Sequence, residues 1–153
     1  GINMSIKVIT ENRKARFDYH ILDTFEAGIV LVGSELKPIR AGQVQLKDSY
    51  VEFHNGEMYL INVHISGYQS SSYNNHTPER KRKLLMNKAE IHKMYVKVKE
   101  KGLTSIPLKM YFKKGFVKVE IALVKGKKEY DKRDTIKKRD QKRELQGIMK
   151  KSR

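Results

Sequence analysis

Two runs of alternating apolar residues, joined by two residues, constrain the fold of this chain more than any other feature. Apolar side chains occupy every second position from Ile106 to Phe112 and again from Val117 to Leu123. A two-residue turn at Lys114-Gly115 would pair position 112 with 117, 110 with 119, 108 with 121 and 106 with 123. The eight side chains would then share one face. The pattern predicts an antiparallel β-hairpin with one side turned to a core.

The opposite face of this hairpin interleaves lysines with aromatic residues. Its members are Lys109, Tyr111, Lys113, Phe116, Lys118 and Glu120. An ordinary solvated sheet surface has this composition, and so does a surface for nucleic acid. Both interpretations stay open at this point.

A second hairpin is predicted around Asn55-Gly56, because Asn and Gly best tolerate the positive φ angles of a type I′ turn. This turn pairs Phe53 with Met58 and Val51 with Leu60 on one face. The next apolar residues have the opposite phase, so the far end of the second strand is expected to be covered on both sides. They are Ile61, Val63 and Ile65.

One helix is predicted between the hairpins. Asn87 is a suitable N-cap with Glu90 three residues on, and Gly102 supplies the stop. Between them an apolar stripe repeats at helical spacing, at Ile91, Met94, Tyr95 and Val98. Residues 84–86 (LLM), just before this helix, are typical of a short buried strand.

The earlier part of the body predicts a strand and a short helix. Residues 28–33 (GIVLVG) are expected to end a strand that begins near Phe17, and residues 34–40 to form a helix before Gly42. Pro38 lies beyond the first turn of that helix, where it removes a backbone donor. Several short antiparallel strands with few helices indicate a mainly β protein with α, built as a small closed antiparallel β-barrel with about three helices.

Charge and cysteine content exclude several classes of protein. The 153 residues include 33 Lys+Arg against 17 Asp+Glu, a net charge of +16, and no cysteine. A disulfide scaffold, a thiolate zinc site and a cysteine nucleophile are therefore excluded. No apolar run approaches the roughly 20 residues that span a bilayer. We expect a cytoplasmic protein with a polyanionic partner and no membrane association.

The charge also divides the chain. Residues 125–153 hold thirteen Lys/Arg against five Asp/Glu, so we expect a basic tail that is disordered when free. Residues 12–124 form the expected packed domain, and residues 1–11 an extension whose first residues read like a cloning remnant before Met4. In the tail, Leu145, Ile148 and Met149 share one helical face, which predicts a helix once a partner covers it.

Motifs for covalent chemistry are absent from the sequence. The five histidines lie outside metal-ligand spacings, and the sequence contains no GxSxG, Walker A or GxGxxG motif. We therefore expect no catalytic residues, no metal and no cofactor. Residues 66–78 are predicted to form a long polar loop of the kind that is usually functional or mobile.

Basic clusters give a footprint for phosphates instead. They lie at 12–16 (NRKAR), at 80–83 (RKRK) and at Lys125, Lys127 and Lys128. Such clusters neutralise phosphates and release counterions, with little sequence preference. Exposed aromatic residues could stack on unpaired bases; the candidates are Tyr68, Tyr73, Tyr111 and Phe116. Together these features predict nucleic-acid binding.

An ordered set of segments resembles the SsrA-binding protein family, also called small protein B. The segments are NRKARFDYHI at 12–21, EAGIVLVGSELKPIRAG at 26–42, LKDSYV at 46–51, NGEMYLINVHIS at 55–66, NHTPERKRKLL at 75–85 and LKMYFKKGFVKVEIALVKGKKEYDKR at 108–133. The resemblance implies a barrel of the oligonucleotide-binding type. It also implies that the chain binds the tRNA-like part of transfer-messenger RNA and carries it to stalled ribosomes for trans-translation. There it would occupy the decoding region of the small subunit as a monomer without catalytic activity.

The resemblance places pairs of residues in three RNA-binding motifs of the family. The pairs are Asn12 and Lys14, Glu35 and Lys37, and Leu85 and Asn87. Together with the basic clusters, the expected RNA-binding residues are Asn12, Arg13, Lys14, Arg16, Glu35, Lys37, Arg40, Arg82, Lys83, Leu85, Asn87, Lys125, Lys127 and Lys128. Residues of the tail match elements linked to ribosomal function; they are Tyr130, Asp131, Lys132, Arg133, Ile148 and Met149.

Two of these positions allow other interpretations. A carboxylate at Glu35 would accept from a base edge or a 2′-OH, hold a neighbouring cation, or cap the helix that starts near Ser34. The pattern around Leu85 favours a core position over a ligand. For the whole chain, a general RNA-binding or ribosomal protein and an RNA-modifying enzyme remain as alternatives, the second disfavoured by the missing catalytic motifs.

Overall fold

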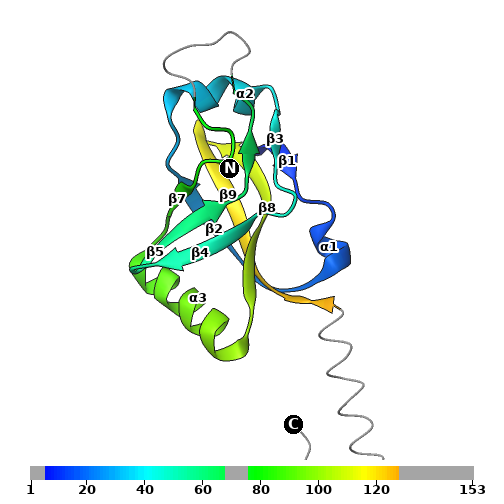
Figure 1. The fold of residues 1–153 in the computed structure, drawn as a ribbon, viewed down its shortest axis with the longest axis vertical. Coiled ribbons are helices and arrows are strands. Elements are labelled where there is room, and N and C mark those ends of the chain that lie inside the picture. The colour runs from blue at the N-terminus through cyan, green and yellow to red at the C-terminus, as the bar shows by residue number, and fades with distance from the viewer. Residues whose placement is uncertain (1–5, 68–75, 128–153) are drawn as a thin grey trace, which may run out of the picture.

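The computed structural model describes residues 6–67 and 76–127 (Figure 1). Its strands and helices follow one another as β1 (Ile6–Glu11), α1 (Ala15–Asp18), β2 (Tyr19–Ile29), the 3₁₀ turn η1 (Gly33–Glu35), α2 (Leu36–Arg40), β3 (Val44–Gln45), β4 (Tyr50–His54), β5 (Glu57–Ile61), β6 (His64–Ile65), β7 (Arg82–Leu85), α3 (Lys88–Lys101), β8 (Thr104–Lys113) and β9 (Phe116–Gly126). The mainly β composition with three α-helices agrees with the prediction. None of the described helices is both long enough and apolar enough to cross a bilayer.

The sheet is open, so the expected closed barrel is wrong. Seven strands pair in the order β1-β8-β9-β2-β7-β5-β4, and β3 pairs separately with β6. Each strand has two edges for hydrogen bonding, and those of β8 are taken by β9 and by β1. Residues 1–11 are predicted to be an extension before the packed domain, whereas residues 6–11 form β1 and pair with β8. With β1 on the second edge of β8, the two edge strands of the sheet are β1 and β4, and these two strands do not pair with each other in the described part of the chain.

The β4–β5 hairpin forms as predicted. Phe53 pairs with Met58 and Val51 pairs with Leu60. Asn55 has φ 49° and Gly56 has φ 77°, which are the left-handed conformations that a type I′ turn requires. The local sequence alone therefore determines this turn and its register.

The β8–β9 hairpin keeps its predicted turn and loses its predicted register half-way. Phe112 pairs with Val117 and Met110 with Val119, but a β-bulge then lies between Pro107 and Lys109. Beyond it Ile106 pairs with Ala122, so the predicted pairs 108–121 and 106–123 are wrong. A bulge adds one residue to one strand, and the side chains that follow change face.

The changed face carries a second, smaller core. Ile106 and Leu108 pack on the outer side of the hairpin with Ala122, Val124 and Ala15 of α1. In Figure 1, α1 lies beside the lower part of this hairpin, near the end of β9. The bulge therefore gives α1 an apolar surface on which to pack, and this places the neighbouring basic residues.

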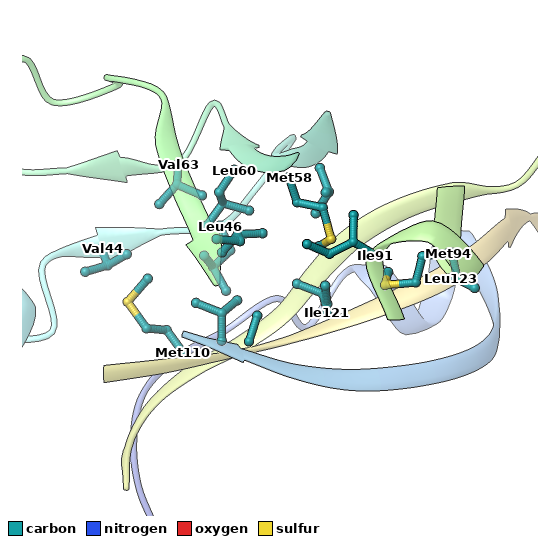
Figure 2. Packing of buried hydrophobic residues seen from close by; sticks show 14 of the residues in the cluster. Val44, Leu46, Met58, Leu60, Val63, Ile91, Met94, Met110, Ile121 and Leu123 are labelled. Atoms are coloured by element: carbon teal, nitrogen blue, oxygen red, sulfur yellow. The ribbon is translucent and has the colours of Figure 1, made fainter. Parts of the chain in front are cut away.

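The main core fills the inside of the curled sheet. Figure 2 shows Met58 and Leu60 on one side, facing Met110 and Ile121 on the other. Helix α3 contributes from one end of the sheet, and the β3–β6 pair and α2 contribute from the other; the side chains are Ile91 and Met94, then Ile39, Val44 and Ile65. Burying each such side chain stabilises the fold by about 1.5–3 kcal/mol.

Helix α3 has the predicted ends. The Asn87 side chain accepts a hydrogen bond from the Ala89 amide at 2.8 Å, and Gly102 ends the helix with φ 63°. The helix buries Ile91 and Met94 of the predicted stripe. Two neighbouring predictions differ in detail: β2 ends at Ile29 rather than Gly33, and Phe17 belongs to α1.

Candidate nucleic-acid interface

The first basic cluster lies at the start of α1 and just before it. The Asn12 side-chain amide donates to the Pro107 carbonyl at 3.1 Å, and the Asn12 backbone amide donates to the Leu108 carbonyl at 2.7 Å. These bonds fix the chain to the bulged part of β8, and buried Ala15 anchors the helix. The cations around it are left on the surface; they are Arg13, Lys14 and Arg16. Asn12 thus has a structural role in the cluster that it opens.

Strand pairing brings a second basic cluster beside the first. Tyr19 pairs with Gly126 and His20 with Lys125, so the end of β9 runs next to the end of α1. A small hollow beside α1 is also lined by Lys14 and Lys47. We call this group the α1 patch; it comprises Arg13, Lys14, Arg16, Lys47, Lys125 and Lys127. Lys47 was missed by sequence reasoning, because an isolated lysine near a turn carries no signal of its own.

The third basic cluster splits between surface and core. Arg82 has no exposed surface, and neither has Glu35. Arg82 Nε donates to Glu35 Oε2 at 2.6 Å, and Arg80 Nη2 donates to Glu35 Oε1 at 2.7 Å. The remaining guanidinium donors of Arg82 are satisfied by the carbonyls of Val63, Arg80 and Pro78, at 2.8, 3.0 and 2.9 Å. A side chain so enclosed has no donor left for an RNA phosphate, so a direct contact by Arg82 does not fit this structure.

Glu35 has two roles at once: it binds the guanidinium groups of Arg80 and Arg82, and it caps the 3₁₀ turn η1. Its Oε1 also accepts from the Val32 backbone amide at 2.9 Å. Burial raises the pKa of Glu35, but the hydrogen bonds from Arg80, from the Val32 amide and from Arg82 outweigh it, so the pKa lies below its ordinary value. The carboxylate is therefore charged and enclosed. Contact with a base edge or a 2′-OH does not fit its burial, whereas holding a neighbouring cation and starting the helix both do.

The residues around Glu35 remain at the surface. Lys37 and Arg40 lie exposed on α2, while Arg80 is half-buried beside the carboxylate. We call Lys37, Arg40 and Arg80 the α2 patch. Figure 1 shows α2 at the top of the molecule and α1 lower on the right, so the two patches occupy different parts of the surface.

Two further lysines of the third cluster are paired with carboxylates. Lys81 Nζ lies 3.1 Å from Glu52 Oε1 and 4.5 Å from the centre of the Tyr59 ring. Lys83 Nζ lies 3.3 Å from Glu57 Oε2. Exposed pairs of this kind are worth about 1 kcal/mol or less, so they leave these lysines available to a phosphate.

Leu85 is exposed, contrary to the pattern-based prediction. Half of its surface (50%) is accessible, whereas Leu84 beside it is buried. Pairing of Gly28 with Leu85 puts the Leu85 side chain on the outer face of the sheet. A Cβ atom added at Gly28 would come within 3.4 Å of Leu85 Cβ, so the leucine packs against the bare glycine. This makes Leu85 available as an apolar contact next to Asn87.

On the outer face of the β8–β9 hairpin, one of the two aromatic residues is buried in the fold and the other is exposed. Tyr111 is 4% exposed, and its hydroxyl donates to Glu26 Oε2 at 2.5 Å. Burial and this bond raise the pKa of Tyr111, and the same bond lowers the pKa of Glu26. Stacking of a base on Tyr111, as the sequence suggested, does not fit its burial. Phe116 is 68% exposed and stays a candidate.

Several expected site residues lie outside the described part of the chain. They are Lys128, Tyr130, Asp131, Lys132, Arg133, Ile148, Met149, Tyr68 and Tyr73. The predictions for the tail and for most of the polar loop at 66–78 lie there too. Within the described residues, no group of three or more His, Cys, Asp or Glu side chains is placed to hold a metal ion.

The fold and the exposed cations define a small, strongly basic protein with an open antiparallel sheet. Known proteins then specify the family. The model of the SmpB protein family matches residues 9–151, so this chain belongs to that family.

Curated relatives agree in name and in length. The SsrA-binding protein of Trichodesmium erythraeum is 55% identical over 145 residues, which cover 94% of this chain and 93% of the relative. The SsrA-binding protein of Bdellovibrio bacteriovorus is 53% identical over 149 residues, covering 97% of this chain and 98% of the relative. Among solved structures, a chain described under the words "tmRNA-SmpB: a journey to the center of the bacterial ribosome" is 50% identical with a TM-score of 0.66. That match covers 77% of this chain and 83% of the other.

Proposed function

We propose that this protein binds transfer-messenger RNA through its tRNA-like part and delivers it to stalled ribosomes for trans-translation. The supporting observation is the similarity over nearly the full chain to proteins named for binding SsrA, together with 50% identity to a chain in a tmRNA-SmpB ribosome structure. It would act in the cytoplasm as a monomer that binds RNA without changing it covalently.

The α1 and α2 patches are the RNA-binding surfaces in this proposal. Their exposed cations supply the phosphate contacts that dominate affinity for nucleic acid. Glu35 and Arg82 are positioning residues, because they fix Arg80 and the start of α2 from inside the fold. Leu85 is exposed at the end of β7 and offers an apolar contact to a base.

Competition binding tests the RNA specificity. Labelled tRNA-like RNA bound to the protein is challenged with unlabelled tRNA-like RNA or with a random single strand of equal length. We expect the first competitor to displace the label at much lower concentration. Equal displacement by both would replace this proposal with a general RNA-binding protein.

A translation assay tests the delivery step. Ribosomes stalled on a message without a stop codon receive transfer-messenger RNA with or without the protein, and addition of the peptide tag is measured. Tagging that requires the protein supports delivery. Tagging at the same rate without it contradicts delivery, and altered nucleotides in RNA recovered from the assay would point to an RNA-modifying enzyme.

A further inference from the structure

A groove separate from both basic patches lies between α3 and the tip of the β4–β5 hairpin. Its volume is about 590 Å³, within the range of roughly 300–1,000 Å³ that small-molecule sites occupy. In Figure 1 the hairpin tip and the start of α3 meet at the lower left, away from both α1 and α2.

The inner wall of the groove is aromatic and fixed in position. The rings of Phe53 and Tyr95 meet edge to face, with centroids 5.9 Å apart and an interplanar angle of 62°. Phe53 packs against the main core, and Ile91, which also lines the groove, is buried in that core. Tyr95 is nevertheless 40% exposed. An aromatic ring that is fixed in position and partly exposed is a surface on which a flat ligand can stack.

The rim of the groove is polar and carries no carboxylate. Its side chains are His54, Asn55, Lys88 and His92. Lys88 forms no ion pair with an acidic residue in the described part of the chain, whereas Lys81 and Lys83 do. An aromatic wall, several hydrogen-bonding groups and an unpaired ammonium suit a ligand that has a flat ring and a negative charge.

We propose that this groove, which we call the hairpin groove, binds one unpaired nucleotide of the RNA partner. The base lies against Phe53 and Tyr95, and Lys88 pairs with the phosphate. The RNA partner itself rests on the proposed function above. Stacking of unpaired bases on aromatic side chains is the usual means by which proteins read single-stranded RNA.

The charge of the rim favours RNA over a peptide. A docking peptide would meet a groove without a carboxylate on a chain of net charge +16, so it would need to be acidic as well as aromatic. A nucleotide combines both properties in each unit. The groove also provides amide and imidazole groups at the rim, which can reach the edge of a base.

Binding of two probes tests the hairpin groove. Hexa-adenylate reports on stacking of unpaired bases, and the tRNA-like RNA reports on the proposed partner. The variants are Tyr95→Leu, Tyr95→Phe and Lys88→Gln, with Lys93→Gln on the exposed side of α3 as the matched control. Thermal melting of each variant verifies that it is folded.

We expect Tyr95→Leu to weaken hexa-adenylate binding by roughly tenfold at unchanged salt dependence, because stacking carries no charge. Tyr95→Phe should bind as the parent does. Lys88→Gln should weaken binding and reduce the salt slope by about 0.7, the value for one phosphate contact to a single strand. Lys93→Gln should change neither.

Two results would overturn the proposal. Equal hexa-adenylate binding by Tyr95→Leu and Tyr95→Phe would show that no base stacks on this ring, and the groove would then bind a side chain of a protein partner instead. A parent protein that does not bind hexa-adenylate would lead to the same conclusion. A parent protein that binds hexa-adenylate but does not bind the tRNA-like RNA would instead refute the proposed function. The two failures are therefore distinguishable.

Discussion

Arg82 Nε donates to Glu35 Oε2 across 2.6 Å, although the two residues lie 47 positions apart and neither exposes any surface. Each charge offsets the cost of burying the other, and the carbonyls around Arg82 satisfy its remaining donors. The pair therefore connects the start of α2 to β7 from inside the fold. The pair contributes first to the stability of the fold. It affects RNA binding only because Glu35 also positions Arg80.

Replacing Glu35 by Gln should destabilise the protein. The amide oxygen can still accept from the Val32 amide, but Arg82 becomes a buried charge without a counter-charge. Breaking a buried pair in this way costs about 3–5 kcal/mol. Urea unfolding measures the loss, and Glu100→Gln on the exposed surface of α3 is the matched control. A Glu35→Gln protein as stable as this control but weaker in RNA binding would assign Glu35 a direct role in recognition.

The same carboxylate should make stability depend on acid pH. The folded-state pKa of Glu35 lies below its ordinary value of 4.5, so its contribution is complete above the unfolded-state pKa and is lost as pH falls through the folded-state pKa. The difference in unfolding free energy between the parent and Glu35→Gln should be largest near neutral pH and shrink below about pH 4. A difference that is constant from pH 7 to pH 3 would contradict this assignment.

The turn of the β8–β9 hairpin provides a test of backbone strain. Gly115 has φ 79°, and a Cβ atom there would meet no atom within 4 Å. Gly115→Ala should still cost about 1–2 kcal/mol, because the left-handed conformation is unfavourable for residues with a side chain. Gly126→Ala is the control, since that site is equally open and lacks a positive φ. Equal melting temperatures for the two variants would show that the turn tolerates alanine.

Neutralising cations in the two basic patches should weaken RNA binding. Lys14→Gln in the α1 patch and Lys37→Gln in the α2 patch should each cost about 1 kcal/mol in affinity for tRNA-like RNA and flatten the salt slope by about one unit. Lys93→Gln should leave both quantities unchanged. Binding isotherms at several salt concentrations measure them. If neither patch variant differs from Lys93→Gln, the RNA lies on another surface.

Deleting residues 130–153 should separate RNA binding from ribosomal function. The α1 and α2 patches lie entirely within residues 13–127, so affinity for tRNA-like RNA should remain nearly intact. Peptide tagging on stalled ribosomes should be abolished, and charged residues at Ile148 and Met149 should impair the same step. Binding and tagging assays on the same preparations check both halves. A truncated protein that still supports tagging would refute this division of labour.

The sequence by itself determined the features that depend on a few neighbouring residues. Asn55-Gly56 specified a turn and the register of β4 with β5, because few other residue pairs adopt the required φ angles. Asn87 and Gly102 specified both ends of α3 through a cap and a left-handed stop. The family was also recognisable from the ordered segments, and the match over residues 9–151 to the SmpB family confirms it.

Tertiary structure decided the features that depend on distant partners. The bulge near Leu108 turns apolar side chains toward α1, where they form the second core. Its cause lies in this distant contact, so the alternation of residues in β8 could not predict it. The sheet ends in β1 and β4, which do not pair in the described residues, and β1 joins it through the edge of β8 rather than lying outside it. Arg82 is buried and Leu85 exposed, the reverse of what their side-chain types suggest. A charge can be enclosed only where a counter-charge meets it, and the Glu35 that meets Arg82 is brought there by the fold.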